Sequence, residues 1–222
     1  MRSVTASFPE IRKLLKSAGH AVLGLTAAIA AGLVFYGGQK WSDALLRASS
    51  ISIVVTTVAF NVLAETRWIY PTIARLTRRP LVHGLWVGYL TSDYGVREGR
   101  PPLAPIKIFF VIRQSYLHVS IESHTRAQES YSTIEHLEKS EKTGAGHLEY
   151  FFEMIRTAHS ENKITVGYGK LRLLDQGQSM SGDYWTNSPT QGQLKVTLVT
   201  RDCEEINSFE FASAVEERLE QV

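Results

Sequence analysis

The sequence lacks several features that would assign the protein to a large functional class. Its 222 residues include one cysteine, Cys203, which excludes an intrachain disulfide and a zinc ribbon. The charge is nearly balanced, because 24 basic and 22 acidic side chains give a net charge of +2. This balance argues against binding to a DNA or RNA polymer, which requires a basic excess.

Signatures of common enzymes are also absent. The chain has no GxGxxG, Walker A, GxSxG, HExxH or paired CxxC motif. His118, Glu122 and His124 would share one face of a strand, but no set of closely spaced metal ligands emerges. We therefore predict no catalytic residue, no metal site and no cofactor, and an enzyme is the least favoured class.

Two long apolar segments near the N-terminus are the first positive feature. Residues 18–38 carry no formal charge apart from a possible charge on a histidine, and residues 48–64 carry none. At about 1.5 Å per residue the first segment would cross a bilayer, and the second is close to the lower limit for a span. We predict two transmembrane helices. The alternatives are buried helices of a soluble bundle and a secretory signal cleaved near residues 28–30.

The composition of these segments indicates how they associate. Gly24, Ala28 and Gly32 form a track of small residues that lets another helix approach closely, and we predict that this track mediates oligomerisation. In the second segment Ser49, Ile53, Thr57 and Asn61 recur every four positions, so the polar groups among them can face a partner helix. Basic residues outnumber acidic ones on the outer flanks of the pair, which predicts that both termini are cytoplasmic.

Beyond Pro80 the pattern changes to short alternating runs separated by turn residues, which is typical of β-strands. We predict eight strands: Gly84–Thr91, Ile106–Arg113, Leu117–Ser123, Tyr131–Glu138, Leu148–Ile155, Ile164–Leu174, Ser179–Trp185 and Gln193–Thr200. Closure removes the exposed edges of an open sheet, so consecutive strands with short links favour a closed barrel. Such a barrel can hold one small ligand.

The predicted fold class is all-β. Residues 81–203 form an eight-stranded antiparallel up-and-down barrel of the lipocalin or streptavidin kind, and residues 1–80 hold the transmembrane hairpin and its linker. Residues 204–222 form an amphipathic helix, for which Asn207 and Glu210 predict a capping box. Its apolar stripe consists of Ala212, Val215, Leu219 and Val222.

Aromatic and basic side chains recur along the predicted strands. The aromatic ones are Trp86, Tyr89, Tyr150, Tyr168, Tyr184 and Trp185, and the basic ones are Arg113, Arg156 and Arg201. Aromatic faces stack on nucleobases and guanidinium groups pair with phosphates, so these residues are candidates for binding a nucleotide. The alternative is that most of the aromatics fill the barrel core. Strand alternation alone does not assign Arg113 and Arg201 to the inner face.

Three stretches of the barrel carry a resemblance to a known family. The first strand reads Gly84-Leu85-Trp86-Val87-Gly88-Tyr89, and later stretches read Leu148-Glu149-Tyr150-Phe151 and Ser181-Gly182-Asp183-Tyr184-Trp185-Thr186. Together with two N-terminal membrane helices, they resemble the two-transmembrane β-barrel effectors of bacterial CBASS anti-phage systems. The pattern of that family often continues to an arginine where this chain has Asn187.

The resemblance implies a membrane effector without catalytic activity. In that family a CD-NTase makes a cyclic dinucleotide on infection, the barrel binds it, and the protein oligomerises in the inner membrane and disrupts it. By this resemblance Thr186 joins the candidate binding residues. The second hypothesis is a membrane-anchored, lipocalin-like carrier of a small apolar ligand. Charged and tyrosine side chains lining the pocket would favour the nucleotide, and an aliphatic lining would favour the carrier.

Overall fold

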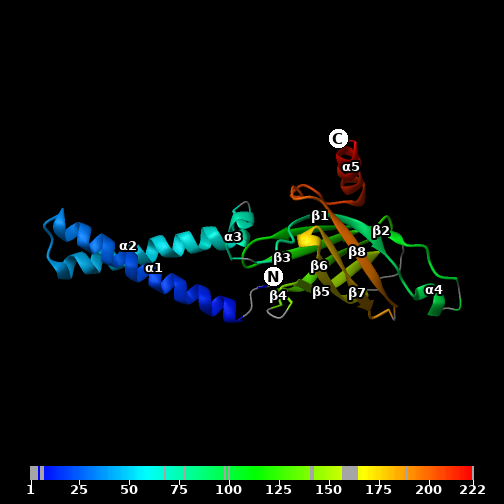
Figure 1. The fold of residues 1–222 in the computed structure, drawn as a ribbon, viewed down its shortest axis with the longest axis horizontal. Coiled ribbons are helices and arrows are strands. Elements are labelled where there is room, and N and C mark those ends of the chain that lie inside the picture. Colours follow the sequence, from blue (N-terminus) through cyan, green and yellow to red (C-terminus); the bar gives the residue numbers. More distant parts are fainter. Residues whose placement is uncertain are drawn as a thin grey trace.

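A long helical hairpin and a β-barrel lie end to end along the long axis of the molecule in a computed structural model (Figure 1). The structure describes residues 5, 8–67, 69–77, 79–97, 99, 101–140, 143–156, 165–188 and 190–221. We call the end of the barrel that faces the hairpin the proximal end, and the opposite end the distal end. The short helix α4 (Tyr94–Arg97) lies beyond the distal end (Figure 1).

The hairpin consists of α1 (Phe8–Phe35) and α2 (Trp41–Glu65). Both helices are long and apolar enough to cross a membrane, and they pack through small side chains such as Ala30, Ala44 and Ala48. In their most apolar windows only 6% and 11% of the residues are buried inside the chain. Core helices of a soluble bundle would be mostly buried, so the soluble-bundle alternative does not fit this structure.

The barrel confirms the predicted fold class. Its strands are β1 (Gly84–Leu90), β2 (Ile106–Gln114), β3 (Val119–His124), β4 (Gln128–Lys139), β5 (Gly146–Arg156), β6 (Thr165–Leu174), β7 (Ser179–Thr186) and β8 (Thr190–Thr200). Each strand pairs antiparallel with its neighbours in sequence, and β1 pairs with β8 to close the barrel. All eight predicted strands are present, with their ends shifted by a few residues. The short helices α3 (Tyr70–Thr77) and α4 were not predicted.

Alternate residues of each strand point inward and form a continuous apolar core. Two glycines of β6 face this core beneath aromatic rings of β5. A Cβ atom on Gly167 would lie 2.3 Å from the Phe152 ring, and one on Gly169 would lie 2.4 Å from the Tyr150 ring. The glycines therefore make room for large rings inside a narrow barrel, which explains their place in the middle of a strand.

The proximal end of the barrel is sealed by Trp86. Its ring is fully buried, and its Nε1 donates a hydrogen bond of 2.8 Å to the Val82 carbonyl. The guanidinium carbon of Arg201 lies 5.4 Å from the centre of the ring, and its nitrogens donate to the carbonyls of Leu81, His83 and Gly177. Burial lowers the pKa of Arg201, but an arginine stays charged at neutral pH and holds these segments together.

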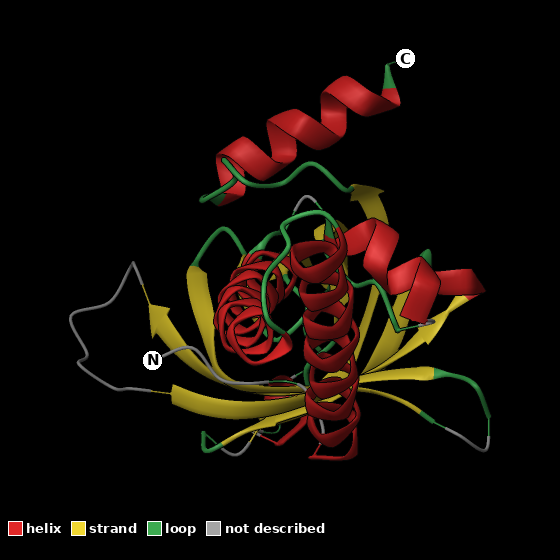
Figure 2. Ribbon diagram, turned by 90° about the vertical axis from the view of Figure 1, so that its left-hand side faces the viewer, coloured by secondary structure: helices red, strands yellow, loops and turns green. Residues whose placement is uncertain are grey.

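The C-terminal helix α5 (Phe209–Glu220) lies outside the barrel wall (Figure 2). Apolar residues of this region, including Ala212 and Ile206, pack against Phe109 on the outer face of β2. The predicted cap is wrong by one residue. Ser208 is the N-cap and its side chain accepts a hydrogen bond from the Phe211 amide, because only Ser208 stands directly before the first helical residue.

One member of the predicted apolar stripe lies outside this contact. Leu219 is 47% exposed, and Val222 lies outside the described residues. The helix contact therefore uses the first part of the stripe, where Ala212 is fully buried and Val215 is partly buried.

Removing the Trp86 ring should destabilise the protein far more than removing an exposed ring of the same kind. We expect Trp86→Ala to lower the free energy of unfolding by about 3–5 kcal/mol, because it leaves a cavity at the proximal end of the barrel core. Trp185→Ala, at a position that is 50% exposed, should cost less than about 1 kcal/mol. Urea unfolding of the full chain in detergent, followed by circular dichroism, measures both. Equal losses would mean that the seal does not stabilise the barrel.

Candidate ligand-binding site

The inner face near the distal end of the barrel gathers the motif residues of β5 and β7. Strand pairing brings Tyr150, Gly169 and Tyr184 into one row, which continues to Glu135 on β4 and Gly192 on β8. One step towards the distal end, a second row contains Phe152, Gly167 and Thr186. Bulky and glycine residues therefore alternate around this half of the barrel, and the glycines leave room for the neighbouring rings.

The tyrosines of this site differ in depth. Tyr150 is buried, and its ring packs on Phe110 and Phe152 at centroid distances of 6.1 and 5.7 Å. Tyr184 is only partly buried, and its hydroxyl donates a hydrogen bond of 3.1 Å to the Thr91 carbonyl. Burial raises the pKa of both phenols, so both stay neutral at physiological pH, and the proton of Tyr184 is donated to Thr91.

Polar groups accompany these rings inside the barrel. Glu135 is 6% exposed and accepts a hydrogen bond from the Ser132 hydroxyl at an irregularity of β4. The Thr186 hydroxyl lies 2.7 Å from the hydroxyl of Thr190. Deeper in the barrel, towards the seal, the row is aliphatic and contains Leu137, Leu148 and Leu171. Along β4–β6 the inner side chains are therefore aliphatic near the proximal end and more polar towards the distal end, while on β2 the buried Gln114 lies at the proximal end.

Other predicted aromatic residues point away from the interior. Tyr89 and Trp185 are 56% and 50% exposed on the outer wall, and Tyr168 lies beside Trp185 with ring centroids 6.1 Å apart. Trp86 belongs to the proximal seal, as the core-filling alternative expected. Of the predicted aromatic residues, the structure therefore brings Tyr150 and Tyr184 together inside the barrel.

The predicted arginines do not meet at this site in the described structure. Arg113 points outward, where it pairs with Glu122 at 2.8 Å and donates to the Ile206 carbonyl at 2.7 Å. Arg201 belongs to the seal. The side chain of Arg156 lies outside the described residues, so its role as a phosphate partner stays a prediction.

Comparison with known families adds an independent observation. The family model for the Cap15 cyclic dinucleotide receptor domain matches residues 77–198, which is more than half of the chain. The chain belongs to the Cap15 cyclic dinucleotide receptor family. Its two apolar helices and eight-stranded barrel fit a CBASS effector of the two-transmembrane type, as the sequence resemblance predicted. The search of curated proteins found no match.

Sequence reasoning missed Phe152 and Glu135 among the inner residues of the barrel, whereas Gly167 and Gly169 stood out as glycines in the middle of a predicted strand. The signal for Phe152 was available, because it follows Tyr150 by two positions and strand alternation places it on the same face. Glu135 could not be assigned from alternation, because the register of β4 shifts between Ser132 and Ile134. Among the described residues, no three histidine, cysteine or acidic side chains are placed to hold a metal ion.

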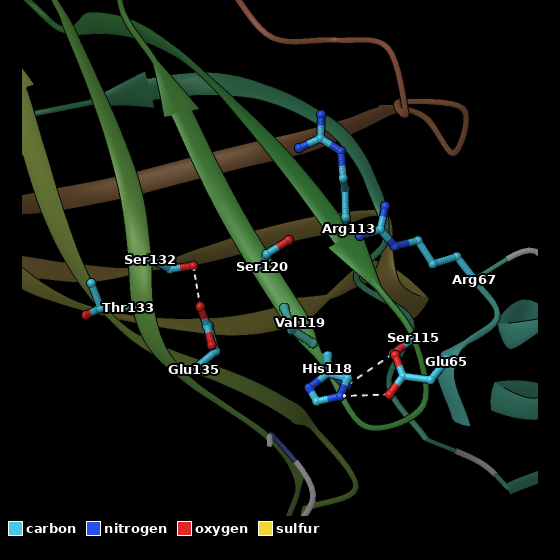
Figure 3. Close-up of a pocket in the computed structure, with 10 residues that line it drawn as sticks. All are labelled: Glu65, Arg67, Arg113, Ser115, His118, Val119, Ser120, Ser132, Thr133 and Glu135. Carbon is cyan, nitrogen blue, oxygen red and sulfur yellow. Dashed lines mark hydrogen bonds and ion pairs between the residues drawn. The ribbon is translucent and has the colours of Figure 1, made fainter. Parts of the chain in front are cut away.

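A hollow lies where the hairpin meets the barrel, and its lining includes Ser132 and Glu135 of β4 (Figure 3). It has a volume of about 110 Å³ and opens between β3 and β4, which pair only over Glu122–His124 on β3. A dinucleotide needs a larger pocket, because sites for small molecules measure roughly 300–1,000 Å³. We therefore describe this hollow as the joint between the hairpin and the barrel, not as the ligand site.

Two polar contacts connect the end of α2 to the barrel side of the joint. Glu65 lies 3.3 Å from the His118 ring on the β2–β3 turn (Figure 3). Arg67 pairs at 2.7 Å with Glu204, which precedes α5, and Glu204 lies 3.8 Å from Arg113 of β2. The joint therefore links the last turn of the membrane helix to the wall of the barrel.

The predicted oligomerisation track faces away from the partner helix within the hairpin. A Cβ atom on Gly24 or Gly32 would meet nothing within 4 Å, and Ala28 is exposed. On α2, the contact with α1 uses Ala44, Ala48 and neighbouring small residues, while Thr57 and Asn61 remain exposed. Both predicted association surfaces are therefore uncovered by the described chain.

Breaking the Arg67–Glu204 pair should weaken the joint between the hairpin and the barrel. We expect Arg67→Glu to lower the free energy of unfolding of the full chain in detergent by about 1 kcal/mol, because two acidic side chains would repel each other at the joint. The conservative variant Arg67→Lys keeps the attraction and should unfold like the unmodified chain in urea. If Arg67→Glu is as stable as the unmodified chain, the pair does not hold the joint.

Proposed function

We propose that this chain is the membrane effector of a CBASS system, switched on by a cyclic dinucleotide that binds inside the distal half of the barrel. A CD-NTase supplies the nucleotide, and binding drives oligomerisation of the transmembrane helices in the bacterial inner membrane. The assembled helices interact with the lipids and disrupt the bilayer, with both termini of the chain in the cytoplasm. The chain itself performs no catalysis and needs no cofactor.

The observation that carries this proposal is the inner row of Tyr150 and Tyr184 with Gly169 between them, in a barrel of the cyclic dinucleotide receptor family. Tyrosine rings offer stacking faces to bases, and their hydroxyls and the Glu135 carboxylate offer hydrogen-bonding groups. The glycine between the tyrosines lets the Tyr150 ring lie against the strand backbone inside the barrel.

This lining also distinguishes the proposal from the carrier hypothesis. An aliphatic lining would favour an apolar ligand, and the proximal leucines together with Leu90 and Leu194 supply part of such a lining. The inner face of β4 and β7 also carries Glu135, Tyr184 and Thr186, whose carboxylate and hydroxyl groups suit a polar ligand. These polar groups therefore favour a nucleotide over a lipid.

The phosphates of the ligand would face the rim of the distal end. Arg156 ends β5 at this rim, where its backbone pairs with Gln128, and we retain it as the candidate phosphate partner. At the position where the family often has an arginine, Asn187 instead exchanges hydrogen bonds with Val166, through its amide and its side-chain oxygen. Asn187 thus fixes the end of β7 against β6 and supplies no positive charge.

Binding acts as a switch only when the ligand prefers the assembled state. The joint described above offers a route for this preference, because Arg67 and Glu65 at the end of α2 contact the barrel and the segment before α5. A change in the barrel wall would then alter the angle of the hairpin and favour contact through the Gly24–Gly32 track.

The tyrosines separate into an inner and an outer set, and this separation gives the central test. We expect Tyr184→Ala to weaken binding of the best cyclic dinucleotide by roughly ten- to a hundredfold, through loss of about 1–3 kcal/mol of stacking. Tyr168→Ala, on the outer wall, should change binding less than twofold. Calorimetry of the full chain in detergent against a panel of cyclic dinucleotides measures both affinities.

Two results would contradict this assignment. Equal weakening by both variants would exclude an inner site formed by β5 and β7. Failure of every cyclic nucleotide to bind, together with binding of a fatty acid, would favour the carrier.

The track on α1 gives a second test. We expect Gly32→Leu to abolish toxicity in cells that make the nucleotide, because a large side chain prevents close helix contact. Nucleotide binding should stay intact, since this residue lies in the hairpin. Ala27→Leu, which adds a similar side chain at an exposed position on another face of α1, is the matched control. Unchanged toxicity of the Gly32 variant would show that the track merely faces lipid.

A further inference from the structure

An exposed apolar row crosses the outer wall of four strands. Ile134 of β4 pairs with Phe151 of β5, which pairs with Tyr168 of β6, which pairs with Trp185 of β7. The side chains of Ile134, Phe151 and Trp185 are 58%, 46% and 50% exposed. The rings of Phe151 and Tyr168 lie 5.2 Å apart, so the row is a continuous surface. We call it the aromatic row.

On the other half of the barrel wall, the outward apolar side chains are covered by another part of the chain. On β1 and β2, the outward side chains of Leu85, Phe109 and Val111 are fully buried, because α5 and the segment before it cover them. None of the described elements covers the aromatic row in the same way. A contiguous apolar patch rimmed by polar residues is typical of a protein interface.

The position of the aromatic row relative to the membrane indicates which molecule can contact it. The hairpin extends from the proximal end along the long axis, so a bilayer around the hairpin would lie beyond that end (Figure 1). The wall of β4–β7 then faces sideways, towards other proteins in the same membrane. Copies of this chain that are anchored in one bilayer hold their barrels at the same height and can bring their walls together.

The charges beside the row also favour a second copy over a lipid surface. In the neighbouring row of side chains, Glu149 pairs with Lys170 at 2.6 Å, and Lys170 is followed by Asp183. Glu153 flanks the aromatic row on its other side. Acidic groups on both flanks are repelled by the anionic leaflet, which attracts basic clusters. Alternating signs, in contrast, let two facing copies bring acidic groups against basic ones.

We propose that the aromatic row is the surface through which the barrels of two copies contact each other in the membrane. The inference rests on the proposed function, because oligomerisation is the step that nucleotide binding is expected to drive. It adds a second contact between copies, formed by the barrels and separate from the contact between the membrane helices.

The test uses the full chain in detergent and the variant Phe151→Glu. We expect this variant to weaken self-association at least tenfold in sedimentation experiments, with and without cyclic di-GMP, cyclic di-AMP or cyclic GMP–AMP. Nucleotide binding should change less than twofold, because Phe151 points outward. Phe211→Glu is the matched control, since Phe211 on α5 is 43% exposed and lies outside the row. Ile134→Glu repeats the test in case Phe151→Glu folds poorly.

Three results would overturn the inference. The first is that both row variants associate as the unmodified chain does. The second is that the unmodified chain stays monomeric at all concentrations and with every nucleotide. The third is that the row variants lose binding to anionic vesicles but keep self-association, which would assign the row to lipid. If the unmodified chain associates but binds no nucleotide, the proposed function fails while the comparison of variants still tests the row.

Discussion

The contact between Arg201 and Trp86 is the interaction on which the rest of the structure depends. Arg201 comes from the end of the last strand and lies over a ring from the first strand, so it fastens the two strands that close the barrel. Its hydrogen bonds to the carbonyls around Leu81 and Gly177 also hold the links that enter and leave neighbouring strands. Because Trp86 fills this end, the ligand site is proposed in the distal half.

The seal also determines how a signal can travel. In the proposed function the nucleotide lies inside the barrel and the hairpin joins at the sealed end, so the nucleotide would act on the helices through the barrel. The proposed path runs through the wall of the barrel to Arg113 and Glu204, and from Glu204 to Arg67 after the end of α2. These side chains are ion pairs at a surface, which can change partners more readily than a packed core.

The two halves of the outer wall of the barrel differ in how their apolar side chains are covered. α5 covers the outward apolar residues of β1 and β2, including Phe109, and makes that half a stable extension of the core. The half formed by β4–β7 keeps Phe151 and its neighbours exposed while Tyr150 and Phe152 point inward from the same strand. One strand thus contributes to the proposed ligand site through its inner face and to the proposed barrel contact through its outer face.

Much of the fold and part of the site could be predicted from the sequence. The alternation of side chains with a period of two residues predicted eight strands, and the length of the apolar segments predicted two membrane helices. Both patterns are local properties of the chain. The motifs around Tyr150 and Tyr184 were also visible, and these residues lie in the inner row. The amphipathic pattern predicted α5, although its N-cap proved to be Ser208.

Only the tertiary structure decided which side of the barrel each candidate faces. Tyr168 and Tyr184 look alike in sequence, but the pairing register places one on the outer wall and the other inside. Arginine is a residue type that binds phosphate groups, which made Arg113 and Arg201 candidates. In the fold, however, they donate hydrogen bonds to carbonyls about 90 and 120 positions away in the chain. Alternation along a strand defines two faces, and closure of the barrel then makes one of them the interior.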